Sequence, residues 1–264
     1  MKRLIIAAAG MATAAVPVLA AAGPTKPTIV LVHGAFETSA VWGQVKATLE
    51  GDGYKVLNVD LPGRTGNEAP TNEVTLESYQ RAVATAIAGE TAPVVLVGHS
   101  FGGFTISAEA EAEPRKVKTL VYVAAYIPKS GDSLLSMATA DKGSKLGPLL
   151  VIDKQRGFAS VKEGAGGGVF ASDGSRQVQD AVSGAVIAEP LAPLATPVTL
   201  TSAMFGKVDK VAIRTLRDQV ISPSFQAAMI KAAPVRLALT IDTGHVPFVT
   251  QPKALAAEIV KAAR

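Results

Sequence analysis

Gly98-His99-Ser100-Phe101-Gly102 directly follows the apolar run Pro93-Val94-Val95-Leu96-Val97, and this stretch decides how the chain folds. A short continuous apolar run is typical of a strand buried on both faces of a sheet. A Gly-x-Ser-x-Gly turn between such a strand and a helix lifts the serine hydroxyl clear of the sheet. The turn is tight, so the neighbours of Ser100 must be small. We interpret Ser100 as a candidate nucleophile; the alternative is a glycine-rich turn with an incidental serine.

Short apolar runs alternate with helical patterns over most of the chain. This alternation predicts an α/β fold with a mostly parallel central sheet and helices on both faces. We expect strands over Thr28–Val32, Lys55–Val59, Val94–Val97, Thr119–Ala124, Lys210–Ile213 and Val235–Ile241. We expect helices over about Ser39–Glu50, Leu76–Ala88, Phe101–Glu111, Ser224–Ala232 and Pro252–Ala263.

The alternation stops between residues 129 and 197. This segment contains a glycine run over residues 164–168 and a proline-punctuated stretch over residues 189–194. A long insertion without structure is uncommon in a compact domain unless it serves a function. We therefore expect a cap or lid over the strand ends; the alternative is a flexible surface excursion. The glycine run does not follow a strand, so it does not favour a dinucleotide site.

The first residues have the pattern of a secretory signal. Lys2 and Arg3 are followed by an apolar stretch over residues 4–19 and by the small residues Ala20-Ala21-Ala22. We expect cleavage near residue 22, which leaves one domain over residues 23–264 in a periplasm or outside the cell. The alternative is an N-terminal membrane anchor, but the run is short for a span. After cleavage we expect no stable membrane insertion.

Composition excludes several kinds of site. The 264 residues include no cysteine, so disulfides, thiolate metal sites and a cysteine nucleophile are ruled out. The formal net charge of +4 falls to +2 without Lys2 and Arg3, and the other basic residues are scattered. We therefore expect no nucleic-acid partner. There is no phosphate loop or cluster of metal ligands, so no metal and no organic cofactor is expected.

A nucleophilic serine needs a base, and the chain has three histidines. His99 lies inside the turn, directly before the serine. His33 follows the first strand, where it is more suited to shaping a loop. His245 follows the last strand, and loops at the carboxyl edge of a parallel sheet are where ligands and catalytic groups meet. We expect His245 to be the base; the alternative is a surface-loop histidine.

The acid that orients the base is expected between the serine and the histidine in chain order. Asp218 is the first candidate for this acid, because it lies after the strand over residues 210–213 and shortly before a helix. Asp132 is the second candidate. Asp209 precedes its strand and so lies at the wrong edge, and Asp242 is too near His245 in the chain to orient it easily. The structural alternative for Asp218 is an ion pair with a neighbouring arginine.

An oxyanion hole needs two backbone N–H groups. One is expected from Phe101, directly after the serine, and the other from Ala35 in the loop after the first strand. Phe36, Tyr126 and Phe248 are candidate substrate-binding residues by position, although aromatic side chains there also serve as core.

These motifs together resemble the α/β-hydrolase superfamily, and within it a small branch of plant methyl esterases, hydroxynitrile lyases and bacterial esterases. The resemblance covers essentially all of the expected mature chain. It rests on residues 31–36, Trp42, 60–63, 98–103, 122–125, 214–218 and Gly244-His245. It implies the α/β-hydrolase fold and hydrolysis of a carboxylic ester through an acyl-serine. The expected cap is short of aromatic residues and has no cluster of basic residues, which favours a small, mainly apolar ester. The motifs are specific for the branch rather than for a substrate or an oligomeric state.

Two positions separate esterases from lyases within this branch. The resembling hydroxynitrile lyases have threonine where this chain has Gly34, and lysine where it has Val246. Neither residue here is lyase-like, which favours the esterase interpretation. The alternatives are an amide or C–C bond hydrolase with the same residues, a hydroxynitrile-lyase-like enzyme and a non-catalytic ligand receptor, because a fold does not determine a function.

Overall fold

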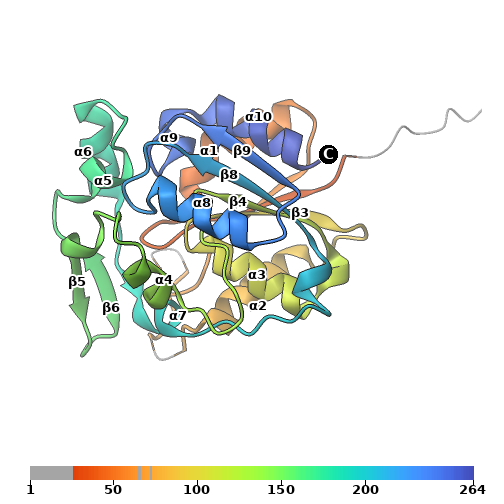
Figure 1. Cartoon of the computed structure of the whole chain (residues 1–264), viewed down its shortest axis with the longest axis horizontal. Helices are drawn as coiled ribbons and strands as arrows, with labels where there is room; N and C mark the ends of the chain where they lie inside the picture. Colours follow the sequence, from red (N-terminus) through yellow and green to blue (C-terminus); the bar gives the residue numbers. More distant parts are fainter. Residues whose placement is uncertain (1–25, 65–66, 72) are drawn as a thin grey trace, which may run out of the picture.

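The computed structural model describes residues 26–64, 67–71 and 73–264 (Figure 1). The secretory signal expected over residues 1–22 lies outside these described residues. None of the described helices is both long and apolar enough to cross a bilayer.

The main element is a six-stranded sheet in the order β2-β1-β3-β4-β8-β9, and every neighbouring pair in it is parallel. All six expected strands are present, which confirms the α/β class. Their bounds are β1 Ile29–Val32, β2 Val56–Val59, β3 Val94–His99, β4 Val117–Val123, β8 Asp209–Thr215 and β9 Leu237–Ile241.

Helices cover both faces of this sheet (Figure 1). α1 (Gly43–Gly51) packs against α10 (Pro252–Ala262) on one side, and α2 (Leu76–Ile87) packs against α3 (Gly102–Ala112) on the other. α8 (Pro223–Ala232) packs on β8. The five expected helices are found, although the first begins as the 3₁₀ turn η1 (Ser39–Trp42).

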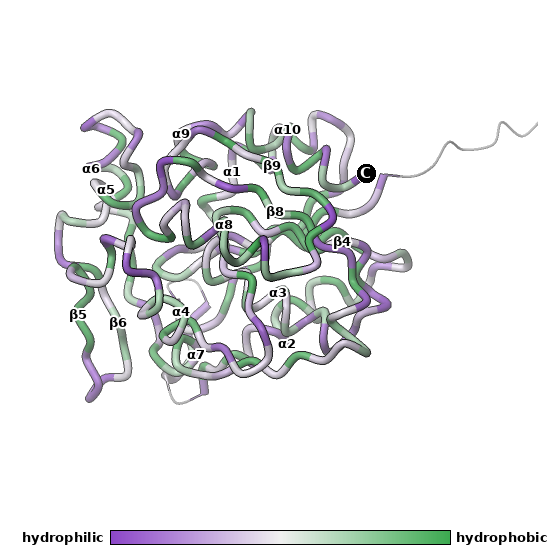
Figure 2. Tube along the Cα trace, in the orientation of Figure 1, coloured by the Kyte–Doolittle hydropathy of each residue, from purple (hydrophilic) through white to green (hydrophobic). Residues whose placement is uncertain are grey.

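Because helices cover both faces, the strands of the sheet are mainly apolar, and green predominates in the middle of the molecule (Figure 2). Every residue of β1 and β3 is buried. Local signals set the helix starts. The hydroxyl of Thr75 caps α2, and that of Ser222 caps α8, where Pro223 takes the first helical position.

The insertion over residues 129–197 is folded into short elements. A three-stranded antiparallel sheet in the order β5-β6-β7 is flanked by small helices. β5, β6, α5 and α6 lie together at the left of the molecule (Figure 1). The elements are α4 Leu134–Ala140, η3 Gly147–Leu149, β5 Leu150–Asp153, β6 Phe158–Val161, α5 Gly166–Phe170, α6 Arg176–Ala185, β7 Glu189–Pro190 and α7 Leu191–Ala195.

The glycine run of the insertion has a packing role. A Cβ atom on Gly167 would lie 1.8 Å from the carbonyl oxygen of Gln179, so only glycine lets α5 approach α6 this closely. The remaining elements are η2 (Pro114–Lys116), η4 (Phe205–Lys207) and α9 (Pro247–Thr250).

Candidate active site

Ser100 lies in the turn between β3 and α3, here called the nucleophile turn (residues 98–102). Its φ of +51° is in the left-handed region, which serine rarely adopts. Its N–H donates to the Val123 carbonyl oxygen at 3.2 Å. A Cβ atom on Gly98 would lie 2.7 Å from the Gly102 carbonyl oxygen, and one on Gly103 would lie 2.1 Å from the Tyr126 carbonyl oxygen. The small residues around Ser100 are therefore required by the backbone.

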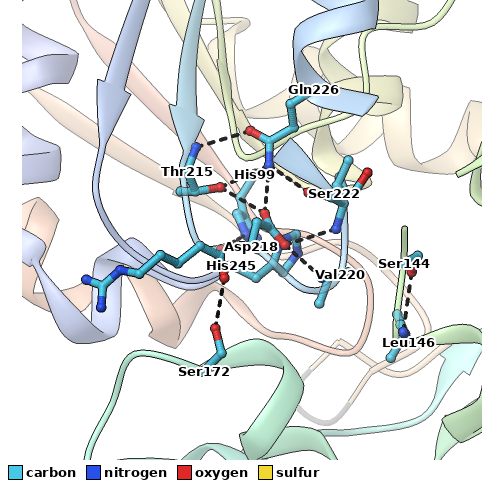
Figure 3. Close-up of polar contacts among 12 residues, drawn as sticks. His99, Ser144, Leu146, Ser172, Thr215, Asp218, Val220, Ser222, Gln226 and His245 are labelled. Atoms are coloured by element: carbon cyan, nitrogen blue, oxygen red, sulfur yellow. Dashed lines mark hydrogen bonds and ion pairs between the residues drawn. The ribbon is translucent and has the colours of Figure 1, made fainter. Parts of the chain in front are cut away.

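His245 lies in the loop after β9, here called the base loop (residues 242–246). Its Nδ1 is 2.9 Å from Asp218 Oδ2 (Figure 3). Its backbone N–H donates to the Phe170 carbonyl oxygen at 3.0 Å, so the insertion lies directly over this loop. The Nε2 atom of His245 is buried and has no hydrogen-bond partner among the described residues. It is therefore available for proton transfer with a bound group.

Asp218 is a buried carboxylate with a full set of donors (Figure 3). Oδ2 accepts hydrogen bonds from His245, Thr215 Oγ1 and Gln226 Nε2 at 2.8–2.9 Å. Oδ1 accepts from the N–H groups of Val220 and Ile221 at 2.8 and 2.9 Å. These bonds offset the cost of burying the charge. Since a carboxylate only accepts, His245 carries its proton on Nδ1 and leaves Nε2 bare.

The structure places Asp218 beside His245, and the second candidate, Asp132, lies elsewhere. Asp132 accepts a hydrogen bond from the Lys129 N–H at 2.8 Å in an exposed loop. Asp242 pairs with Arg217, with 2.9 Å between Oδ1 and Nε. Arg217 is therefore engaged elsewhere and does not neutralise Asp218.

The two expected oxyanion donors occupy suitable backbone positions. Ala35 lies in the loop after β1, here called the oxyanion loop (residues 33–37), and Phe101 lies at the N-terminus of α3, where the helix dipole is positive. In the oxyanion loop the N–H of Gly34 donates to Glu37 and that of Phe36 donates to Glu189. Within the described part of the chain, neither the Ala35 nor the Phe101 N–H donates a hydrogen bond.

Sequence reasoning missed a buried ion pair that joins the insertion to the sheet. Glu189 on β7 pairs with Arg64, accepts from the Tyr79 hydroxyl at 2.8 Å and accepts from the Phe36 N–H at 3.0 Å. Burial raises the pKa of Glu189, although Arg64 opposes that shift. The two partners are 125 residues apart in the chain, so no local pattern marks them.

A second missed pair is Glu37 with His99, at 3.0 Å between Oε2 and Nδ1. Both side chains are almost fully buried. Glu37 belongs to the oxyanion loop and His99 to the nucleophile turn, and the ring of His99 lies 4.6 Å from that of His245. Glu37 and His99 are 62 residues apart in the chain, so no local motif marks them and only the structure reveals this pair.

An apolar pocket of about 480 Å³ lies between the insertion and the helices α1 and α9. Of the three candidate substrate-binding residues, Phe36 and Phe248 line it and Tyr126 does not. Phe170 of the insertion also lines it, and its ring lies 5.8 Å from the His245 ring. Phe170 therefore contacts both this pocket and the ring of the base.

Two larger pockets lie away from Ser100 and His245, one of them of about 880 Å³ beside η2 and η4. The other, of about 640 Å³ near α4 and α8, is lined by Asp132, the second candidate for the acid, but by neither Ser100, Asp218 nor His245. No group of three or more His, Cys, Asp or Glu side chains could hold a metal ion among the residues that the structure describes.

Comparisons with known proteins agree with the fold. The family model described as "Alpha/beta hydrolase family" matches residues 29–258, a range that includes every candidate residue. The chain is 28% identical to a pyrethroid hydrolase of Sphingobium wenxiniae over 89% of this chain and 87% of that protein. It is 26% identical to methyl jasmonate esterase 1 of Vitis vinifera over 86% of this chain and 93% of that protein.

A solved structure and a group of longer relatives complete the comparison. The crystal structure of a pyrethroid hydrolase from Sphingobium faniae JZ-2 matches with a TM-score of 0.76 and 25% identity, over 90% of this chain and 98% of that one. Four chloroplastic relatives from Arabidopsis thaliana are 26–29% identical, and the chain spans 55–69% of their length.

Proposed function

Because the chain belongs to the alpha/beta hydrolase family, we propose that it is a serine hydrolase that cleaves a carboxylic ester through an acyl-serine intermediate. Ser100 is the nucleophile, His245 the base and Asp218 the orienting acid. Relatives named as esterases and as a pyrethroid hydrolase support an ester as the substrate.

One observation carries the proposal: a buried Asp218–His245 pair leaves the imidazole Nε2 without a partner beside the nucleophile turn. The His245 ring lies 4.6 Å from the ring of His99, the residue directly before Ser100. A base with one nitrogen fixed by a carboxylate and the other free is the arrangement that activates a serine hydroxyl.

In the first half of the reaction, Ser100 Oγ attacks the ester carbonyl carbon and His245 Nε2 takes the hydroxyl proton. The negative oxygen of the tetrahedral intermediate accepts hydrogen bonds from the Ala35 and Phe101 N–H groups. One such donor commonly lowers the barrier by about 3 kcal/mol. His245 then gives its proton to the leaving alcohol oxygen, and the acyl group stays on Ser100.

In the second half, a water molecule takes the place of the alcohol. His245 removes a proton from this water as its oxygen attacks the acyl carbon, and then returns the proton to Ser100 Oγ. Asp218 keeps the Nδ1–H tautomer and stabilises the imidazolium that forms in each half.

We propose that the substrate is uncharged and mainly apolar. The pocket beside His245 is lined largely by aromatic and aliphatic side chains, and its one ionisable lining group, Glu37, is already paired with His99. Such a wall favours hydrocarbon over charged groups, because an unpaired charge placed there loses its hydration.

The test is hydrolysis of p-nitrophenyl esters of increasing acyl length by wild type, Ser100→Ala and the exposed control Ser202→Ala. We expect turnover in wild type and in Ser202→Ala, and a loss of at least ~10³-fold in Ser100→Ala with the fold unchanged. Equal rates in Ser100→Ala and wild type would refute the acyl-serine, and a preference for charged esters would refute the substrate class.

We also propose export, on the basis of the residue pattern over residues 1–22. N-terminal sequencing of the protein made in a bacterial host should find a mature chain that begins close to residue 23 in the periplasmic fraction. An intact N-terminus in the cytoplasm would refute this proposal.

A further inference from the structure

Three loops of the site meet at one buried ion pair. Glu37 Oε2 accepts a hydrogen bond from the Gly34 N–H at 2.9 Å and contacts His99 Nδ1 at 3.0 Å. On the other side of the ring, His99 Nε2 lies 2.9 Å from the carbonyl oxygen of His245. The pair therefore links the oxyanion loop, the nucleophile turn and the base loop.

The partners determine the protonation of His99. A carbonyl oxygen only accepts, so Nε2 carries a proton. Burial opposes a charged imidazole, but Glu37 outweighs it and raises the pKa of His99. Burial likewise opposes a charged Glu37, yet the contact with His99 keeps the pKa of Glu37 below its ordinary value. His99 is thus an imidazolium that donates from both nitrogens, and Glu37 is its counter-ion.

The surroundings leave little freedom for this pair. The edge of the His99 ring packs against Phe248 at 4.8 Å between centroids, and Trp42 lies 6.4 Å away. A Cβ atom on Gly34 would lie 2.9 Å from Ser100 Cβ and 3.0 Å from His99 Nδ1. A small change in the pair would therefore move the backbone beside both Ser100 and Ala35.

We infer that Glu37 and His99 form a positioning pair for the hydrolysis proposed above, on which this inference rests. The pair holds the Ala35 N–H group and the His245 imidazole at fixed positions relative to Ser100. Neither residue touches the reacting atoms, so they act through the three loops. A misplacement of about 1 Å in such a site can cost ~10²-fold in rate.

The pair also acts through charge. The ionisable groups that face His245 are Asp218 at its Nδ1 and His99, backed by Glu37, against its ring. The insertion contributes the uncharged Phe170 ring and the carboxylate of Asp173, which accepts from Thr243 Oγ1 at 2.7 Å and lies 3.9 Å from Arg217. A positive His99 so close opposes a second positive charge on His245. The acidic limb of the rate profile should therefore depend on Glu37, which a merely structural role would not produce.

The experiment compares wild type, Glu37→Gln, His99→Gln, the double variant and the exposed control Glu50→Gln. The first readout is the rate at which a fluorophosphonate labels Ser100, which needs no knowledge of the natural ester. The second is kcat and KM for a p-nitrophenyl ester across pH 5–9. The third is the NMR spectrum of the ring nitrogens, which is tractable because the chain has three histidines.

We expect Glu37→Gln to lower kcat and the labelling rate about 10- to 100-fold, with KM changed less than about threefold. The double variant should be no slower than the slower single variant, because the two residues act as one unit. The acidic limb should move to higher pH, because the variant loses the positive charge on His99. His99 should carry both ring protons at pH 7.5 in wild type and lose one in Glu37→Gln.

Other results would overturn the inference. Variants as fast as wild type, or effects that add in the double variant, would refute the positioning pair while the proposed hydrolysis stands. A singly protonated His99 in wild type would refute it whatever the rates. A wild type that neither reacts with the fluorophosphonate nor hydrolyses esters would refute the proposed function, and the positioning role with it.

Discussion

The central sheet and the insertion over residues 129–197 are stabilised in different ways. The sheet has six parallel strands between two layers of helices (Figure 1), and β1 and β3 in it are buried along their whole length. In the insertion, Val151 and Ile152 on β5 are 46% and 43% exposed, and α6 has no fully buried residue. A few anchors hold the insertion instead, chiefly Glu189 with Arg64, and Phe170 over His245.

We therefore expect the reaction to depend on the sheet edge and the choice of ester to depend on the insertion. The proposed nucleophile, base, acid and oxyanion donors all lie in loops that follow strands of the sheet. The insertion supplies Phe170 and part of the apolar pocket wall. Changes at the sheet edge should therefore affect the reaction itself, whereas changes in the insertion should affect stability and the choice of ester.

The largest effect is expected from Asp218→Asn at the sheet edge. The amide can offer His245 a donor in place of an acceptor, which favours the wrong tautomer, so kcat should fall by about 10⁴-fold. Asp132→Asn is the matched control, because that side chain caps an exposed loop. Steady-state kinetics of both variants decide the matter. A severe loss in Asp132→Asn with a mild one in Asp218→Asn would refute the assignment of the acid.

The sheet and its edge could be predicted from the sequence because both have local signals. A run such as Ile29–Val32 predicts a buried strand from its own residues alone, and Gly98–Gly102 predicts a turn in the same way. The position of a residue after a strand then predicts the edge on which it lies. This is how Ser100, Asp218 and His245 could be selected from single positions in the chain.

The insertion offered no such signal, for physical reasons. Its strands and most of its helices are two to seven residues long, too short to show a hydrophobic period. Its anchor Glu189 finds Arg64 across 125 residues. Glu37 was missed for a related reason, since its role depends on His99, 62 residues away. The fold brings such polar partners together, and the spacing of the residues in the sequence does not predict them.

Glu189→Gln tests whether this anchor holds the insertion on the sheet. The substitution leaves the guanidinium of Arg64 buried without a counter-ion, so the free energy of unfolding should fall by about 3–5 kcal/mol. Glu163→Gln, at an exposed site of the same insertion, is the control. Urea denaturation followed by circular dichroism measures both. A loss below about 1 kcal/mol in Glu189→Gln would mean that other contacts anchor the insertion.

Acid should weaken the packing around His33, the residue that directly follows β1. His33 is buried, and its Nε2 accepts the Leu61 N–H at 3.2 Å. Burial, assisted by Arg64, lowers the pKa of His33 from 6.5 to about 4. The unfolded chain therefore binds a proton that the folded chain does not. The contribution of His33 to the free energy of unfolding is therefore fully present above about pH 6.5. It falls by about 3 kcal/mol as the pH drops towards 4.

Wild type and His33→Gln separate this contribution from others. Glu109, whose pKa burial raises to about 7, contributes in the opposite direction but equally in both proteins. Urea denaturation followed through the single tryptophan, Trp42, reports on the sheet side. The stability difference between the two proteins should shrink from pH 7 to pH 4. Parallel curves would show that His33 does not titrate in this range.

The smallest effect is expected where the two regions meet, at Phe170. Phe170→Leu removes ring atoms that line the apolar pocket and lie against the His245 ring. We expect a stability cost of about 1–2 kcal/mol from the lost packing. If the pocket receives part of the substrate, the wider pocket should raise kcat/KM for long acyl chains by several-fold relative to short ones, a gain of about 1 kcal/mol.

Val178→Ala is the matched control, because Val178 lies on α6 but does not line the pocket. It should leave the ratio of long-chain to short-chain kcat/KM unchanged. An unchanged ratio in Phe170→Leu as well would mean that the insertion covers the site without selecting the ester. Selectivity would then have to reside, like the chemistry, in the loops of the sheet.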